Sequence, residues 1–196
     1  MKIYDISQEV FGCEVYPGDP APKRNILSSI KDGALYNLTE LSMCAHNGTH
    51  VDAPYHFIDD GKGIDEIPLL RLVGWAYVFS HEGILTSDDA KAVLARAEGC
   101  DPECAKRLLM KGHATVSEAA AKAFADAGIY LFGNESQTVG PEDAPMRTHL
   151  ILLGAEVVLL EGIRLGDVDD GRYFLSAAPI SLGGAEGAPC RAILIQ

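Results

Sequence analysis

The chain has 196 residues, of which 47% are hydrophobic and 22% charged, and this length and composition predict one domain spanning residues 1–196. Acidic residues outnumber basic ones by 28 to 16, which gives a formal charge of -12. This excess argues against nucleic acid and against an anionic membrane surface as partners.

The location of the protein is expected to be the cytoplasm. The N-terminal residues contain no long apolar stretch of the kind found in a secretory signal, and Glu156 interrupts the longest apolar run, residues 150–160. Five cysteines, an odd number, favour free thiols in a reducing compartment over a disulfide framework.

The first half of the chain predicts a strand, a loop, a second strand and a helix. Apolar and polar residues alternate over residues 2–10, and two prolines with a glycine predict a loop at residues 16–20. Residues 72–79 have the composition of a strand. A helix is expected to begin with Ser87 as its cap and to stop at Gly99.

The second half predicts one further helix and several strands. Ser117 caps an alanine-rich helix that ends at Gly128 and leads into a buried strand at residues 129–132. Residues 101–110 fit either a helix through Leu109 or a strand at 107–110. Further strands are expected at residues 157–160, 173–178 and 191–195. Strands outnumber helices, so a single α/β or α+β domain is the simplest interpretation.

Three of the six histidines and an aspartate lie between His46 and His56. Glycine and proline within this segment disfavour a helix and indicate an extended chain. Alternate side chains of an extended chain share a face, so His50 and Asp52 are expected to point the same way, and His46 joins them if Gly48 permits a bend.

Two imidazoles and a carboxylate suit Zn²⁺ or Mn²⁺. The absence of cysteine from the segment favours an open catalytic site over a closed structural zinc site. For any single histidine, a hydrogen bond to the backbone of a polar loop is the simpler interpretation. Three imidazoles crowded with a carboxylate favour a metal site, because they would otherwise need many partners or repel one another when protonated.

The string HxGTHxDxPxH is complete from His46 to His56, and it resembles the signature of the metal-dependent cyclase family, which includes bacterial kynurenine formamidases and isatin hydrolases. The element at residues 16–19, Tyr-Pro-Gly-Asp, is similar to an aromatic-PGD element of that family. His149 and Glu161 match a downstream His and Glu at the family's spacing.

This resemblance implies a swivelling β/β/α fold, with a mixed β core and a few flanking helices, and two divalent metal ions. By carry-over, His46, His50 and Asp52 hold one ion, Asp52 and Glu161 bridge, and His149 holds the second. Carboxylates can bridge ions about 3.5 to 4 Å apart and such a pair acidifies a water, which agrees with this assignment.

His56 matches the catalytic histidine of the family, and we expect it to move a proton between the nucleophilic water and the leaving amine. The competing interpretation makes His56 a fourth metal ligand. Tyr16 matches a position at which the formamidases carry a pocket-lining tryptophan, so it is expected to contact the substrate. Residues 133–138 depart from the family pattern, and Glu135 within them is interpreted as turn or surface chemistry. Thr49 is expected either to orient a ligand or to fill a strand.

The resulting hypothesis is a hydrolase that uses metal-activated water to cleave the amide C-N bond of a small aryl substrate, as an arylformamidase does. An isatin hydrolase-like cleavage of a cyclic amide, a metal-dependent lyase, isomerase or cyclase, and a non-catalytic metal-binding protein remain as alternatives. The family resemblance also implies a homodimer. The glycine-rich residues 183–187 lack a P-loop lysine and are interpreted as a turn.

Overall fold

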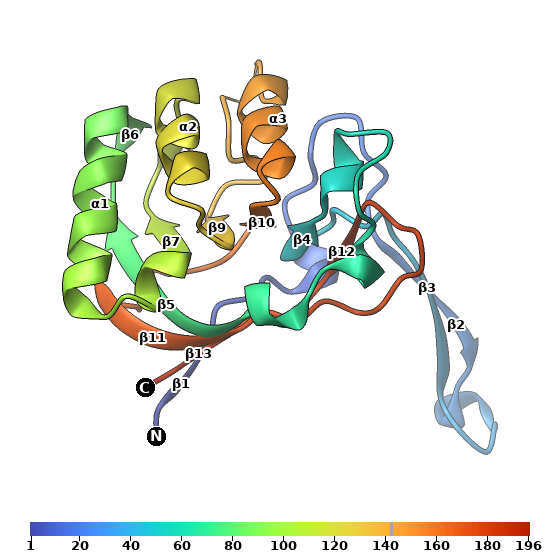
Figure 1. The fold of residues 1–196 in the computed structure, drawn as a ribbon. Coiled ribbons are helices and arrows are strands. Elements are labelled where there is room, and N and C mark those ends of the chain that lie inside the picture. The colour runs from blue at the N-terminus through green and yellow to red at the C-terminus, as the bar shows by residue number, and fades with distance from the viewer. Residues whose placement is uncertain (142) are drawn as a thin grey trace.

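The computed structural model describes residues 1–141 and 143–196, and within them one large mixed sheet forms the centre of the molecule (Figure 1). In spatial order its strands are β1 (Ile3–Asp5), β13 (Ile193–Ile195), β11 (Gly171–Ser176), β5 (Val73–Ser80), β7 (Arg107–Lys111), β9 (Leu131–Asn134), β10 (Val158–Glu161), β4 (His50–Asp52) and β12 (Gly187–Pro189). The four neighbours from β5 to β10 are parallel, and the strands on either side of them pair antiparallel.

Three helices lie side by side over one face of this sheet (Figure 1). They are α1 (Ser87–Cys100), α2 (Glu118–Asp126) and α3 (Met146–Gly154), and each occurs in a crossover between two parallel strands. Connections of one hand place all three on the same face. The structure therefore confirms the expected α/β class, with a mixed β core and a few flanking helices.

The sheet separates two apolar clusters. In β7, Leu108 and Met110 pack under the helices, whereas Leu109 packs on the opposite face with Leu131 and Val158. Side chains alternate across a strand, so a run that is apolar throughout is buried on both faces. This explains why residues 107–111 form a strand, the second of the two alternatives left open by the sequence, after a short 3-10 turn at Cys104–Lys106.

The two predicted helices form, with corrections at the ends of α1. The cap of α1 is Thr86, whose hydroxyl accepts the Asp89 backbone N–H, so Ser87 is the first helical residue. The helix also continues through Gly99 to Cys100, because nothing at Gly99 requires a left-handed backbone. The α2 helix has Ser117 as its cap and is followed by Gly128 at φ 63°, as expected.

Two strands differ in extent from the prediction. Only Ile3–Asp5 of residues 2–10 is a strand, because Glu9 caps a 3-10 turn at Val10–Gly12. The strand expected at residues 129–132 is shifted to Leu131–Asn134. The strands expected at 72–79, 157–160, 173–178 and 191–195 form as β5, β10, β11 and β13 with small shifts at their ends.

A two-stranded hairpin, β2 (Lys23–Ser28) and β3 (Leu38–Ser42), projects away from the body of the molecule (Figure 1). A second small sheet pairs β6 (Gly83–Leu85) with β8 (Ala114–Val116) in parallel. No helix in the described ranges is long and apolar enough to cross a membrane.

Candidate metal centre

The pairing of β4 with β10 brings two distant parts of the sequence together. These strands are antiparallel, with His50 opposite Glu161 and Asp52 opposite Leu159. Directly opposed residues share a face, and side chains alternate along each strand. His50, Asp52 and Glu161 therefore lie on the helix side of the sheet, while Val51 packs into the opposite core. The structure confirms that His50 and Asp52 face the same way.

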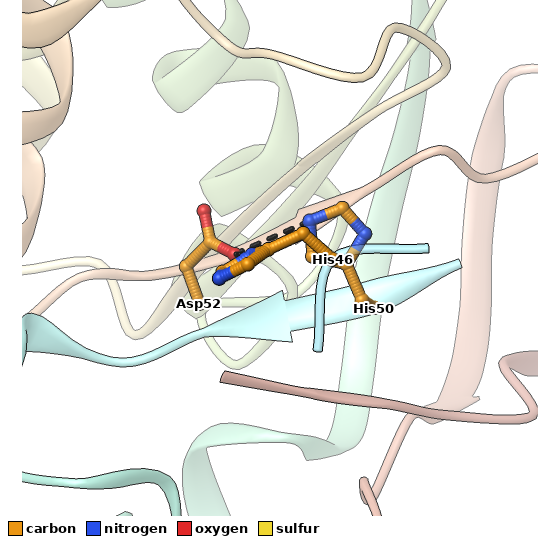
Figure 2. Close-up of side chains that lie close together, drawn as sticks. All are labelled: His46, His50 and Asp52. Atoms are coloured by element: carbon orange, nitrogen blue, oxygen red, sulfur yellow. Dashed lines mark hydrogen bonds and ion pairs between the residues drawn. The ribbon is translucent and has the colours of Figure 1, made fainter. Parts of the chain in front are cut away.

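Gly48 supplies the bend that brings His46 to the same place. Its φ of 72° lies in the left-handed region that glycine adopts without steric cost. The chain then turns so that Nδ1 of His46 lies 3.0 Å from Oδ1 of Asp52, and Nε2 of His50 lies 3.3 Å from the same oxygen. Figure 2 shows the three side chains close together, with dashed lines marking the contacts of Asp52 with the histidine rings.

His149 approaches from the other side, on α3. Its Nδ1 lies 2.9 Å from the carbonyl oxygen of Pro145, one turn earlier in the chain, and this contact fixes the ring. Its Nε2 lies 3.4 Å from Oε1 of Glu161 and 3.8 Å from Oδ2 of Asp52. The helix that carries His149 was not predicted from the sequence, although the residue itself was singled out.

The five residues form two sets that share one carboxylate. His46, His50 and Asp52 offer ligand atoms within 4.8 Å of one another, and so do Asp52, His149 and Glu161. Glu161 also lies 3.7 Å from Nε2 of His50. The arrangement brings together all five residues singled out from the sequence as metal ligands.

The charges of this cluster fit a divalent cation. Asp52 and Glu161 are both buried, and Oδ2 of Asp52 has no hydrogen-bond partner among the described residues. Burial alone would raise the pKa of Asp52, but hydrogen bonds from His46 and His50 outweigh it and hold that pKa well below its usual value. Burial and the charge of Asp52 raise the pKa of Glu161. A cation would relieve the repulsion between these carboxylates.

The neighbouring carboxylates raise the pKa values of the three histidines in the two ligand sets. Burial would lower the pKa of His46, but its hydrogen bond to Asp52 outweighs burial and raises the pKa to about 9. The pKa values of His50 and His149 are also raised, because Asp52 and Glu161 respectively overcome the effect of burial. Imidazole and carboxylate groups without cysteine are ligands for Zn²⁺ or Mn²⁺ in an open site.

His56 belongs to neither ligand set, although it lies next to them. It ends a 3-10 turn, Pro54–His56, and its ring stacks on His46 with 4.1 Å between centroids. Its ring centroid is 6.2 Å from that of His149. Burial lowers the pKa of His56 to about 4, so the ring is neutral at pH 7.

A cavity of about 230 Å³ opens beside the cluster. His56 and Tyr16 both line it, together with Phe57, which was not singled out from the sequence. The aromatic rings give the cavity apolar walls next to the polar cluster, which is the usual composition of a small-molecule site.

Two polar residues noted in the sequence make hydrogen bonds to the backbone. The hydroxyl of Thr49 donates to the carbonyl oxygen of Gly162, at 2.7 Å, and accepts the backbone N–H of Gln8 at 2.9 Å. Thr49 thus fixes the residue next to Glu161.

The carboxylate of Glu135 accepts hydrogen bonds from the backbone N–H groups of Gly112 and Leu165. Glu135 therefore holds two loops together, in keeping with its interpretation as turn chemistry.

Glu186 is a second residue near the cluster, besides Phe57, that was not singled out from the sequence. Its Oε1 lies 3.3 Å from Nε2 of His46. The glycine-rich residues 183–187 around it were interpreted as a turn, and residues 183–184 do form one, after which Gly187–Pro189 forms β12 beside β4. A lone acid in such a stretch gives no signal of its own.

Comparison with known proteins supports a metal-dependent hydrolase. Residues 4–141 match the model of the Cyclase family. The chain is 34% identical to a protein named kynurenine formamidase from Salinibacter ruber, and the match covers 99% of this chain and 97% of that protein.

Solved structures of the same fold exist. A structure described as a "predicted metal-dependent hydrolase" from Bacillus stearothermophilus is 31% identical, with a TM-score of 0.80 over 98% of this chain and 97% of that one. Isatin hydrolase A from Labrenzia aggregata, bound to benzyl benzoate, has a TM-score of 0.83 at 21% identity, with 98% of this chain and 93% of that chain covered. At that identity the likeness shows a common fold.

Proposed function

The chain belongs to the Cyclase family, and from this premise we propose that it is a metal-dependent hydrolase that cleaves the amide C–N bond of a small aryl formamide. The observation that carries the proposal is the pair of ligand sets that share Asp52 beside an aromatic-walled cavity of about 230 Å³. The named activity of the Salinibacter ruber relative, to which the chain is similar over nearly its whole length, supports the same reaction class.

The cofactor is a divalent metal, for which we propose Zn²⁺ or Mn²⁺ and two ions per chain. His46, His50 and Asp52 would hold one ion, and Asp52, His149 and Glu161 would hold the other. Such ions polarise a carbonyl oxygen and lower the pKa of water towards neutrality. The surrounding residues fix the ligands: the Val139 backbone N–H donates to Oε1 of Glu161 at 2.7 Å.

His56 is proposed to transfer the proton. It lines the cavity yet belongs to neither ligand set, so its ring can contact a substrate while the ligands remain in place. An imidazole nitrogen of His56 accepts the proton of the attacking water and returns it to the leaving amine. Tyr16, which lines the same cavity, contacts the aryl group of the substrate.

The test combines turnover and metal content. Purified protein supplied with Zn²⁺ or Mn²⁺ is assayed with N-formylkynurenine, simpler formanilides and isatin, and the formamides are expected to be hydrolysed. Inertness towards every formamide refutes the proposed activity. His56→Ala is expected to keep its full metal content and to lose turnover by about 10²- to 10⁴-fold. Loss of metal from this variant makes His56 a ligand instead.

We further propose a homodimer in which a second copy of the chain covers the projecting hairpin. The apolar side chains exposed along residues 23–42 are Ile26, Leu27, Ile30, Leu35, Tyr36, Leu38 and Leu41. An isolated two-stranded hairpin is marginally stable in water, so this surface favours a partner. The segment carries three basic and two acidic residues, whereas the whole chain carries 16 and 28, which favours contact with the acidic body of another copy.

The mass of the protein in solution tests this assembly. Light scattering is expected to give twice the mass of one chain. Leu35 is 95% exposed in the hairpin, so Leu35→Asp leaves the single chain folded and is expected to shift the mass towards one chain. A single-chain mass for the unmodified protein refutes the homodimer.

A further inference from the structure

The three histidines of the metal centre share a pattern: one ring nitrogen faces the carboxylates, and the other approaches a second oxygen. Nδ1 of His50 lies 3.0 Å from the carbonyl oxygen of Gly48, and Nδ1 of His149 lies 2.9 Å from that of Pro145. Histidines that bind metals usually donate their second N–H to a carbonyl, a carboxylate or water, which fixes the orientation of the ring. In these two histidines the outer oxygen belongs to the backbone.

His46 has the opposite orientation. Its Nδ1 faces Asp52 at 3.0 Å, so Nε2 is the outer nitrogen. This Nε2 is buried and makes no aligned hydrogen bond with the described residues, but it lies 3.3 Å from Oε1 of Glu186. A small rotation of the Glu186 side chain, which is 41% exposed, completes this contact.

The backbone holds Glu186 in this place. Its carbonyl oxygen accepts the backbone N–H of Ala53 at 2.9 Å, next to Asp52 on β4. The following residue, Gly187, pairs directly with Asp52, and a Cβ there would lie 2.9 Å from Cε1 of His46. A glycine at this position leaves room for the ring of His46, and β12 brings a carboxylate to its outer edge.

We propose that Glu186 is a positioning residue of the metal centre: its carboxylate accepts a hydrogen bond from the Nε2–H of His46, so that Nδ1 of His46 is the ligand atom. This inference rests on the proposed metal centre and adds an outer residue to it. A carboxylate also makes the imidazole a stronger ligand than a neutral carbonyl does, because its charge favours donation from the ring. Glu186 is the one side chain among the three outer partners, so it is the one that substitution can test.

The test measures metal affinity for each ion separately, by competition of Mn²⁺ or Zn²⁺ with a chromophoric chelator. Glu186→Ala is expected to weaken the ion held by His46, His50 and Asp52 by about 10- to 100-fold. The ion held by His149 and Glu161 is expected to change much less. Glu186→Gln retains an oxygen acceptor without the charge, and it is expected to recover part of the lost affinity.

Asp59 provides the matched control. It is exposed and lines, with Glu186 and His56, a shallow hollow of about 530 Å³, but no contact joins it to His46 in the described structure. Asp59→Ala removes the same charge from the same surface and is expected to leave both affinities unchanged. Unchanged affinity in Glu186→Ala, or an equal loss in Asp59→Ala, overturns the proposal.

Melting temperatures measured in excess chelator separate positioning from damage to β12. If Glu186→Ala and the unmodified protein have the same melting temperature under these conditions, the loss of metal affinity is not caused by unfolding. The metal affinities are measured without turnover. If the protein binds metal but hydrolyses no formamide, the proposed function is refuted, while the affinities still test the role of Glu186.

Discussion

Asp52 determines the electrostatics of the cluster at the scale of single residues. It is fully buried, and it is the one carboxylate common to both ligand sets. Its hydrogen bonds from His46 and His50 keep it ionised, whereas the neighbouring Glu161 has a raised pKa because burial and the charge of Asp52 oppose its ionisation. Asp52 is therefore ionised without a cation, whereas a bound cation would favour the ionised form of Glu161. Because Asp52 belongs to both ligand sets, its negative charge would act on both metal ions.

This sharing predicts different metal contents for two substitutions. Asp52→Asn removes a ligand from both sets and is expected to reduce the metal content from two ions per chain to none. His149→Ala affects one set and is expected to leave one ion. Elemental analysis of the dialysed proteins gives the number of ions per chain. One full ion per chain in Asp52→Asn would show that the two ligand sets do not share Asp52.

The cysteines allow a prediction about pH. Burial raises the pKa of Cys104 to about 11 and that of Cys190 to about 12, whereas Cys100 is exposed at the end of α1. The thiolate is the reactive form, so at pH 8 roughly one Cys104 in a thousand is reactive, and each added pH unit below its pKa raises the rate about tenfold.

Pulse labelling with iodoacetamide and mass spectrometry are expected to find Cys100 modified first and Cys190 last, with all thiols equal in denaturant. Early labelling of Cys190 would contradict the raised pKa of its thiol. A cytoplasmic location, for which the free thiols were one argument, stays a prediction.

At the scale of elements, β4 and β10 place the ligands and the residues around them maintain the register. Gly162, directly after Glu161, has φ 67°, and its carbonyl oxygen accepts hydrogen bonds from Thr49 and Gln8. The ends of two strands are thereby tied at the position where the ligands meet. The sequence predicted β10 and the extended character of β4, but not the pairing that puts His50 opposite Glu161.

A pair of glycine substitutions tests this role. At Gly162 a Cβ would lie 2.5 Å from the Gln8 side chain and 2.7 Å from the Gly48 carbonyl oxygen, on a left-handed backbone. Gly162→Ala is therefore expected to lower the free energy of unfolding by about 2 kcal/mol or more and to weaken metal binding.

Gly99 is the matched control, because it lies inside α1 and a Cβ added there would have no other atom within 4 Å. Gly99→Ala is expected to raise the free energy of unfolding by about 0.5–1 kcal/mol. Urea titration measures the free energy of unfolding of both variants. An unchanged free energy of unfolding in Gly162→Ala would mean that the strand ends tolerate displacement.

At the scale of the whole molecule, the fold buries two carboxylates near one end of its large sheet. The chain carries a formal charge of -12, and two of its carboxylates are buried in one cluster between the sheet and α3. Bringing both into the interior costs free energy that hydrogen bonds from histidines offset in part. Metal binding to the native state is therefore expected to contribute to the stability of the entire domain.

Removal of metal is predicted to lower the melting temperature. Free metal at a thousand times its dissociation constant stabilises a native state by about 4 kcal/mol, which in a chain of this size corresponds to about 10 °C. Calorimetry with added Mn²⁺ or Zn²⁺ and with excess chelator measures the difference. Identical melting temperatures under the two conditions would contradict tight binding at a native site.

The sequence by itself determined the local chemistry of this protein. The alternation around His50 and Asp52, the flexibility of Gly48 and the caps of the second helix are properties of neighbouring residues, and they predicted a ligand-bearing extended segment and much of the strand content. The motif from His46 to His56 and its resemblance to a known family supplied the remaining ligands.

Only the tertiary structure decided which distant residues meet. Strand pairing set the register of Glu161 against His50, packing against the sheet made a helix of Met146–Gly154, and β12 carried Glu186 to the outer edge of His46. The first and last of these placements join segments more than a hundred residues apart, and no short stretch of sequence encodes such a contact.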